Sequence, residues 1–366
     1  MAHLFEPMTV RGVTLKNRIA VSPMCEYSSE DGFAQDWHLV HLGSRAIGGA
    51  ALIFTEAAAV TAVGRISPQD LGIYRDAHVA MLRRITDFIA AHGGIAGIQL
   101  AHAGRKASTA RPWDGGGPVA TADGGWEAVA PSALAFGDYA VPRALTHAGI
   151  ASVADAFAAG ARRALEAGFR IIEVHAAHGY LLHEFFSPLS NLRTDEYGGS
   201  FQNRTRIAHD VIRAIRAVIP VEVPLFVRIS ATDWADGGWT LDESMRLARD
   251  LRELGVDLID ASSGGLAPQQ RIEVGPGYQV PFAAQIRSDA GIATGAVGMI
   301  TEPGQADDII RSGQADLVLL AREMLRDPYW PLHAASALGA DAAWPPQYER
   351  AKPRPAPKGL MNRTTS

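Results

Sequence analysis

The sequence contains almost no cysteine: Cys25 is the single thiol among 366 residues. One thiol cannot form an internal disulfide framework, and it cannot build a metal or iron–sulfur site that needs several thiolate ligands. We therefore expect a fold without disulfides and no metal site.

An excess of basic charge is also missing. Lys and Arg number 34 against 39 Asp and Glu, which gives a formal net charge of −5, so neither a nucleic acid nor an anionic membrane is an expected partner. Residues 1–11 lack the basic and then apolar pattern of a signal peptide, and no apolar run approaches the length of a membrane span. These absences predict a soluble, cytoplasmic protein.

Two nucleotide-binding motifs are absent as well, GxGxxG after the first strand and GxxxxGK[ST]. The chain instead alternates apolar, β-rich runs with amphipathic stretches such as 77–91, 150–167, 204–218 and 241–254. Eight such runs predict a closed (β/α)8 TIM barrel, an α/β fold, rather than an open doubly wound sheet. The expected strands are 19–21, 51–55, 95–99, 170–174, 225–229, 258–261, 292–296 and 317–320.

Two segments interrupt this alternation. Residues 106–146, after the third strand, are rich in Gly and Pro with interspersed aromatic residues, and so long a loop is typical of a lid over a binding site. A disordered insertion is the alternative. Residues 341–366 are rich in Pro and Arg and predict an extended tail, at a subunit interface. We therefore expect one barrel domain over 1–340, with an N-terminal cap and the lid insertion, followed by the tail.

The segment 171–180 places three reactive side chains directly after an apolar run. Residues 171–174 predict a buried strand, and His175, His178 and Tyr180 follow it. Active sites of (β/α)8 barrels lie at the carboxyl ends of the strands. Two imidazoles can bind an oxygen and a phenol can supply a proton, which indicates catalysis on a polarised small molecule. Taken alone, the HxxH spacing is equally typical of a structural histidine pair.

Other predicted strands also end in polar or small residues. Such a set suits a flat, hydrogen-bonding, partly anionic ligand, and the loops after strands seven and eight commonly hold a phosphate in barrels. A surface salt bridge is the alternative role for the arginine after strand eight. The strand-end residues are Ser22, Pro23, Met24, Cys25, Glu26, Tyr27, Glu56, Ala57, Gln99, Arg228, Gly298, Ala321 and Arg322.

A second class of function stays open at this point. A metal-dependent hydrolase or lyase could use His175 and His178 with an acid such as Glu184 or Glu56. The sequence disfavours it, because no acid–histidine triad stands at metal-ligand spacing.

The chain resembles the Old Yellow Enzyme family of FMN-dependent ene-reductases, in its bacterial branch of YqjM and xenobiotic reductase A. The similarity covers nearly the whole length, and motifs in this order are specific to the family. The matching segments are NRIAVSPMCEYS (17–28), TEAAAV (55–60), GIQLAHAGRK (97–106), EVHAAHGYLLHEFFSPLSNLRTDEYGGS (173–200), VRIS (227–230), AVGMIT (296–301), ADLVLLAREMLRDPYWP (315–331) and PPQYER (345–350).

The resemblance implies roles for residues at the matching positions. His175 and His178 would hold the substrate oxygen, Tyr27 would lie over the substrate, Tyr180 would protonate it, and Arg350 would enter the partner subunit's site. Cys25 would tune the potential of the flavin, where a buried packing role is the alternative. The residues implied to contact FMN are Ser22, Pro23, Met24, Cys25, Ala57, Gln99, Arg228, Gly298, Ala321 and Arg322.

The implied activity is reduction of an activated C=C bond in enones, enals, maleimides or nitro compounds. FMN would be bound tightly without a covalent link, with NADPH, or alternatively NADH, as reductant. The implied assembly is a homodimer or a homotetramer of dimers, and phenols would give a charge-transfer band with the flavin. A dienoyl-CoA-type reductase is the alternative within flavoenzymes, but it needs a thiolate cluster that one cysteine cannot supply.

A few conspicuous residues are expected to be structural. His38 and His41 stand at helical spacing and predict helix-surface or capping positions. Residues 195–199, which begin with Asp195, are expected to fix the loop after the fourth strand by capping the helix that follows. Tyr329-Trp330-Pro331 and Trp344 are expected to pack the last helix or a subunit contact.

Overall fold

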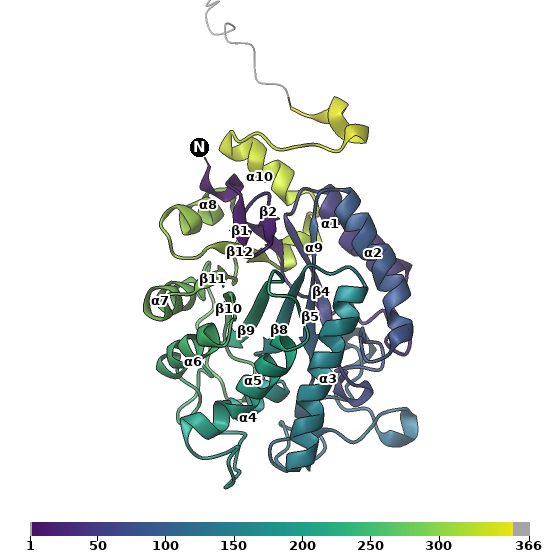
Figure 1. Cartoon of the computed structure of the whole chain (residues 1–366), viewed down its shortest axis with the longest axis vertical. Coiled ribbons are helices and arrows are strands. Elements are labelled where there is room, and N and C mark those ends of the chain that lie inside the picture. The colour runs from purple at the N-terminus through teal and green to yellow at the C-terminus, as the bar shows by residue number, and fades with distance from the viewer. Residues whose placement is uncertain (1, 354–366) are drawn as a thin grey trace, which may run out of the picture.

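A computed structural model describes residues 2–353, and its centre is a closed barrel of eight parallel strands (Figure 1). Each predicted apolar run forms one strand, which confirms the (β/α)8 fold. The strands are rich in Val, Ile, Leu and Ala and are almost wholly buried, as expected when both faces of a parallel sheet are covered. In order around the barrel they are β10 (Leu258–Ser262), β11 (Ala293–Ala296), β12 (Leu317–Leu320), β3 (Ile19–Val21), β4 (Leu52–Ala59), β5 (Ile95–Ala101), β8 (Ile171–Ala176) and β9 (Leu225–Ser230).

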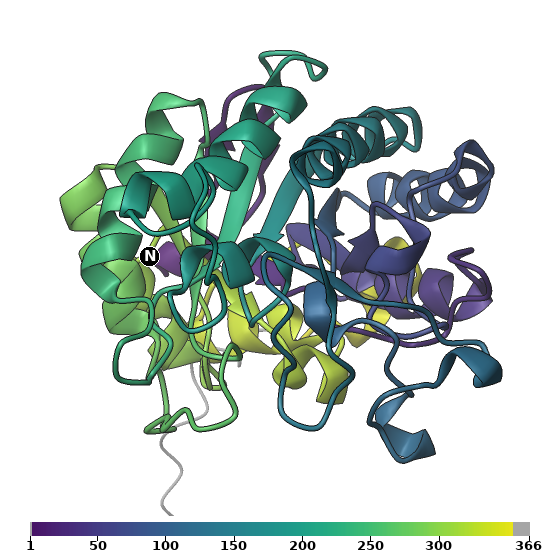
Figure 2. The ribbon, with the colours of Figure 1, turned by 90° about the horizontal axis from the view of Figure 1, so that it is seen from below.

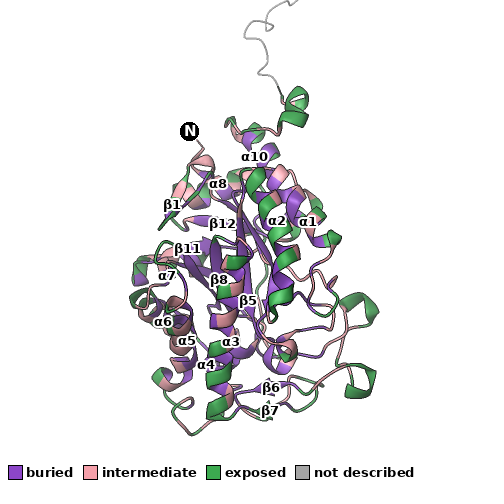
Figure 3. Cartoon of the chain, turned by 45° about the vertical axis from the view of Figure 1, so that its right-hand side comes forward, coloured by how far each residue is buried: buried purple, intermediate pink, exposed green. Residues whose placement is uncertain are grey.

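Helices surround the strands, as Figure 2 shows, and most of them bury one face, as the burial colours of Figure 3 show. In α6, for example, the buried face carries Leu247, Ala248 and Leu251, and Thr240 and Glu243 form a capping box that fixes the helix start. The short helix 181–186 is buried throughout. The helices are α1 (Asp36–Ile47), α2 (Val79–Ala91), α3 (His147–Glu166), α4 (Leu181–Phe186), α5 (Phe201–Arg216), α6 (Leu241–Glu253), α7 (Val280–Ala290), α8 (Pro303–Arg311), α9 (Arg322–Arg326) and α10 (Trp330–Leu338).

Strand β4 is longer than predicted. It continues to Ala59, and its pairing with β5 shifts between Phe54 and Ala57. Glu56 and Ala57 therefore lie inside the strand, at an irregularity, rather than after its end. Such an extra residue redirects the following side chains, and nothing in the apolar pattern marks its position.

The N-terminal residues close one end of the barrel. The hairpin β1 (Met8–Val10) and β2 (Val13–Leu15) packs its buried side chains against barrel residues such as Phe54 and Phe226. This end is apolar, and the polar strand-end residues lie at the other.

The insertion 106–146 has little regular structure of its own. It contains two short 3-10 helices, Pro112–Asp114 and Thr121–Asp123, and the paired strands β6 (Val129–Ala130) and β7 (Arg143–Ala144). The indole N–H of Trp126 donates to the Val63 carbonyl at 2.8 Å and ties the insertion to the body. Figure 2 shows this segment, in blue, reaching outward from one side of the barrel.

The described part of the tail is not extended throughout. Residues Pro346–Ala351 form a 3-10 helix, and Tyr348 lies 6.1 Å from Tyr329 between ring centroids. Residues 354–366 of the predicted tail lie outside the described residues. Between residues 2 and 353, no helix has both the length and the apolar character that crossing a membrane requires.

Candidate active site

The register of the barrel brings the polar strand-end residues together. Gln99 on β5 stands opposite Glu173 on β8, His175 stands opposite Arg228 on β9, and Arg228 stands opposite Asp260 on β10. Three of these five residues were predicted from the sequence. Side chains at neighbouring register positions of a parallel barrel point to a common layer.

Arg228 is the buried cation of this layer. Its Nη1 donates to Ser22 Oγ at 2.9 Å, and its Nε lies 3.1 Å from Asp260 Oδ2. Burial raises the pKa of Asp260, and it raises the pKa of Glu173 to about 8, although Arg228 opposes both shifts. Burial therefore favours the protonated form of Glu173, in which its carboxyl competes less for the charge of Arg228.

Gln99 is held in this layer by Glu173. Its Nε2 donates to Glu173 Oε1 at 2.8 Å. Neither Glu173 nor Asp260 was predicted as a site residue. A signal was present, because an acid within an otherwise apolar strand is costly to bury without a specific partner.

His175, His178 and Tyr180 form one group at the end of β8. The His175 ring centroid lies 5.1 Å from that of His178 and 5.2 Å from that of Tyr180. His178 Nε2 lies 2.7 Å from Ser262 Oγ, whereas His175 Nδ1 is buried without a hydrogen-bond partner in residues 2–353. An unpartnered buried nitrogen is an open position for a ligand oxygen.

The protonation states of this group suit hydrogen-bond donation. Burial, and then the positive charge of Arg228, lower the pKa of His175 and His178 well below the usual value, so both imidazoles are neutral at pH 7. Burial raises the pKa of Tyr180 well above 10, so the phenol keeps its proton.

Cys25 and Tyr27 lie beside this group. Both pack with Tyr180 and Trp126 against the buried residues Ala103 and Ala107. Burial and nearby acids raise the pKa of the Cys25 thiol, so it is not a thiolate at neutral pH. Tyr27 also contacts Trp113 of the insertion edge to face, at 5.8 Å between centroids.

A cavity of about 310 Å³ continues from Arg228 along the ends of β10, β11 and β12. Gly298 has φ +119°, and a Cβ there would lie 2.9 Å from Gln279 Nε2, so only glycine fits. Within residues 2–353 Arg322 takes part in no ion pair, unlike Arg326, which pairs with Glu323. This cavity, which is lined by the cationic side chains of Arg228 and Arg322, suits an anionic group. Predicted residues lining it are Arg228, Gly298, Ala321 and Arg322.

Expectations about other residues met different outcomes. His38 caps α1, as predicted, because its Nδ1 accepts from the Gln35 N–H at 2.9 Å, whereas the expectation was wrong for His41, which is buried in α1 rather than on its surface. Asp195 does not cap α5. Ser200 does so, and Asp195 instead accepts from the Tyr197 N–H at 3.0 Å within the loop.

The acids of the metal-dependent alternative are engaged elsewhere. Glu56 Oε1 lies 2.9 Å from His38 Nε2, and Glu184 accepts from the Arg105 N–H at 2.8 Å. In the part of the chain that the structure describes, no three His, Cys, Asp or Glu side chains gather where they could hold a metal. That alternative therefore has no ligand set in residues 2–353.

Arg350 is not part of the site of its own chain. It lies in the exposed 3-10 helix Pro346–Ala351, at the opposite end of the molecule from α4 (Figure 1). Any role in catalysis would require a neighbouring subunit.

Comparison with known proteins identifies the family. Residues 3–340 match the model of the NADH:flavin oxidoreductase / NADH oxidase family. An NADPH dehydrogenase of Geobacillus sp. (strain WCH70) is 53% identical over 95% of this chain and 98% of its own length, and one of Halalkalibacterium halodurans is 50% identical over the same shares. The chain belongs to this family, the Old Yellow Enzymes. It is an FMN-dependent NADPH oxidoreductase.

Solved structures agree with this assignment. Morphinone reductase matches with a TM-score of 0.77 at 27% identity, over 93% of this chain and 90% of its own. A 2-naphthoyl-CoA reductase matches with a TM-score of 0.83, but at 24% identity the likeness concerns the fold alone. This chain spans about half the length of that enzyme, covering 52% of it.

Proposed function

We propose that the protein is an ene-reductase that reduces the activated C=C bond of α,β-unsaturated carbonyl or nitro compounds. The observation that carries this proposal is the group at the end of β8. Two neutral imidazoles and a protonated phenol gather there: the His175 ring centroid lies 5.1 Å from that of His178 and 5.2 Å from that of Tyr180. His178 also contacts Ser262, which lines the cavity.

In this proposal His175 and His178 bind the carbonyl or nitro oxygen of the substrate. Neutral imidazoles that donate to this oxygen withdraw electron density from the β-carbon and stabilise the negative charge that develops on the oxygen. Donors of this kind contribute about 3–4 kcal/mol each when judged by deletion. Tyr180 then delivers its proton to the α-carbon, and Tyr27 covers the substrate from the side of the insertion.

Bound FMN supplies the hydride, which it obtains from NADPH. Arg228 would face the pyrimidine side of the flavin ring, where a fixed guanidinium stabilises the anionic reduced form. Gly298, Ala321 and Arg322 would hold the phosphate. The remaining proposed flavin contacts are Ser22, Pro23, Met24, Cys25, Ala57 and Gln99.

Cys25 is proposed to adjust the flavin potential rather than to act as a nucleophile. Its raised pKa supports this, because the thiolate is the nucleophilic form. The assembly is proposed to be a homodimer, or a homotetramer of dimers, in which Arg350 from one subunit reaches the site of the next. An arginine on an exposed segment remote from its own site is available for such a contact.

The proposed reaction is tested by following the flavin spectrum. NADPH added without oxygen should bleach the purified yellow protein, and 2-cyclohexenone should then restore the colour and yield cyclohexanone in equal amount. Cyclohexanone, which lacks the C=C bond, is the matched control and should leave the protein bleached. Failure of 2-cyclohexenone to restore the colour would refute the ene-reductase proposal while leaving the flavoenzyme assignment intact.

A further inference from the structure

The turn that carries the reactive group has an unusual backbone. His178 and Gly179 follow each other with φ of +58° and +71°. Positive φ is rare for a residue with a side chain, and it persists only where the surroundings enforce it. A histidine in this conformation, directly before Gly179 and Tyr180, indicates that contacts from the surrounding protein hold the peptide that follows it.

Both polar groups of the His178–Gly179 peptide, its carbonyl and its N–H, form hydrogen bonds with side chains. Lys106 Nζ donates to the His178 carbonyl at 2.8 Å, and the Gly179 N–H donates to His183 Nδ1 at 2.9 Å. The carbonyl and the N–H belong to the same planar unit. Side chains from two different segments thus fix its orientation.

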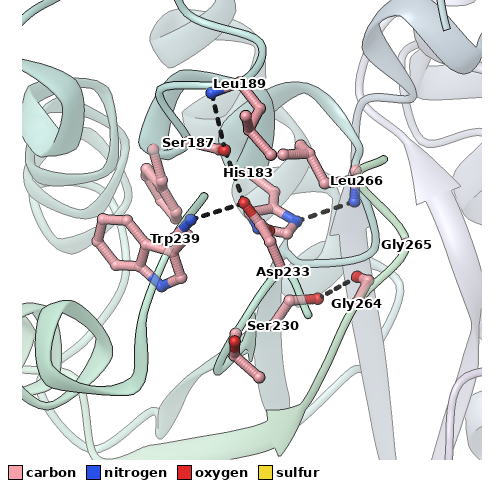
Figure 4. A network of polar contacts seen from close by, with 12 residues as sticks. His183, Ser187, Leu189, Ser230, Asp233, Trp239, Gly264, Gly265 and Leu266 are labelled. Atoms are coloured by element: carbon pink, nitrogen blue, oxygen red, sulfur yellow. Dashed lines mark hydrogen bonds and ion pairs between the residues drawn. The ribbon is translucent and has the colours of Figure 1, made fainter. Parts of the chain in front are cut away.

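His183 is in turn held by Asp233. Its Nε2 lies 2.9 Å from Asp233 Oδ1, and both side chains are fully buried. Asp233 Oδ2 accepts from Ser187 Oγ at 2.6 Å and from the Trp239 N–H at 2.7 Å (Figure 4). Because Nδ1 accepts the Gly179 N–H, the neutral form of His183 carries its proton on Nε2, the nitrogen that lies next to Asp233.

The loop after β10 packs closely against the same turn. A Cβ on Gly265 would lie 2.6 Å from His178 Cα, and one on Gly179 would lie 2.3 Å from the Gly265 carbonyl oxygen. Lys106 Nζ bonds this second carbonyl too, at 3.1 Å. The lysine therefore joins the two loops at their closest approach.

We propose that Lys106 and His183 are positioning residues, which clamp the His178–Gly179 peptide so that His178 and Tyr180 keep the geometry that catalysis needs. The inference rests on the proposed roles of those two residues. Lys106 Nζ also lies 4.9 Å from the centroid of the Tyr180 ring, so it touches the proposed acid directly.

The charge of Lys106 at pH 7 strengthens its part of the clamp. Burial lowers its pKa to about 8, Glu184 opposes that shift and Arg105 adds to it. The amine is thus mostly cationic at neutral pH, and hydrogen bonds from a charged donor are the stronger kind.

The test compares Lys106→Met, which keeps length and removes the donors, with Lys106→Arg, which keeps charged donors. Phenol affinity of the FMN-loaded protein, followed by the charge-transfer band, reports the binding geometry at His178. We expect Lys106→Met to weaken phenol binding about tenfold and to slow reoxidation by 2-cyclohexenone about tenfold or more, since small misplacements of reacting groups have effects of this size. Lys106→Arg should recover most of both.

A matched control separates positioning from general loss of stability. Thr86→Val removes a buried bond from Thr86 Oγ1 to the Ala167 carbonyl (2.5 Å), at the far end of β8 from the turn. It should lower the melting temperature without changing phenol affinity. Wild-type phenol affinity in Lys106→Met, or an equal loss in Thr86→Val, would overturn the clamp.

Two further variants make the outcome decisive. Asp233→Asn keeps the shape but lets the His183 ring change tautomer, so it should weaken phenol binding several-fold even if Lys106→Met does not fold. His178→Ala separates the two proposals. If it leaves phenol binding unchanged, the proposed substrate contact fails; if it weakens binding while Lys106→Met and Asp233→Asn do not, only the clamp fails.

Discussion

The loops after β8 and β5 differ sharply in how they are held. In residues 177–187 every side chain is buried except His178 and Tyr180, which are half-buried. In residues 109–127 of the insertion none is buried, and a Cβ on Gly115, Gly116 or Gly117 would meet nothing within 4 Å. The groups proposed to react thus stand on the enclosed loop, whereas the insertion is loosely packed.

This difference assigns different tasks to the two loops. Catalytic groups must keep their geometry to a fraction of an ångström, and supporting contacts provide that. A loop with few buried contacts can adjust to different substrates, because its local opening costs little free energy. The two loops are joined through Lys106, whose Nζ donates to the His178 carbonyl, and Tyr27 of the loop after β3 contacts Trp113 of the insertion edge to face.

The largest effect should come from the enclosed loop. Tyr180→Phe keeps the ring that packs beside His175 but removes the proton donor. We expect reoxidation of the reduced enzyme by 2-cyclohexenone to slow by about 10²–10⁴-fold, the usual contribution of a general acid. Stopped-flow absorbance of the flavin measures this rate.

Reduction by NADPH in the same variant is the internal control and should stay close to the wild-type rate. Equal reoxidation rates in the variant and the wild type would remove Tyr180 from the proposed mechanism.

A smaller effect, on the pH dependence of the unfolding free energy, should appear where the two loops are joined. Glu184 on α4 accepts the Arg105 N–H at the start of the insertion, and burial raises its pKa to about 8. The pKa of Glu184 is about 8 in the folded state and about 4.5 in the unfolded state. The stability that this difference contributes is fully present below about pH 4.5 and is lost as the pH rises toward 8, because the unfolded state ionises first. Relative to Glu184→Gln, the wild type should therefore lose about 3 kcal/mol of unfolding free energy between pH 5 and pH 8.

Urea unfolding of both proteins at the two pH values, with the same FMN concentration, measures that difference. A constant difference between wild type and variant would contradict a protonated Glu184 in the folded state.

The apolar runs predicted all eight barrel strands, because a strand buried on both faces leaves an unbroken signal in the sequence. The end of β4 was missed because the irregularity between Phe54 and Ala57 depends on pairing with β5. His41 was expected at the surface or at a cap but is buried, because helical spacing alone does not reveal which face of a helix is buried.

The supports of the site were harder to predict than its reactive groups. His175, His178 and Tyr180 are neighbours in sequence, but Lys106, His183 and Asp233 come from three separate segments and meet only in the folded chain. Glu173 and Asp260 could have been noticed as acids within apolar strands. Within the clamp only the Gly179–His183 contact is local in sequence, and the contacts of Lys106 and Asp233 depend on the tertiary fold.

The most direct test of this contrast is hydrogen–deuterium exchange of the FMN-loaded protein, followed by mass spectrometry. We predict that peptides covering 177–187 exchange as slowly as the barrel strands, and that those covering 111–127 exchange within the first seconds. Equally fast exchange in both loops would contradict the claim that the reactive group stands on a rigidly held turn.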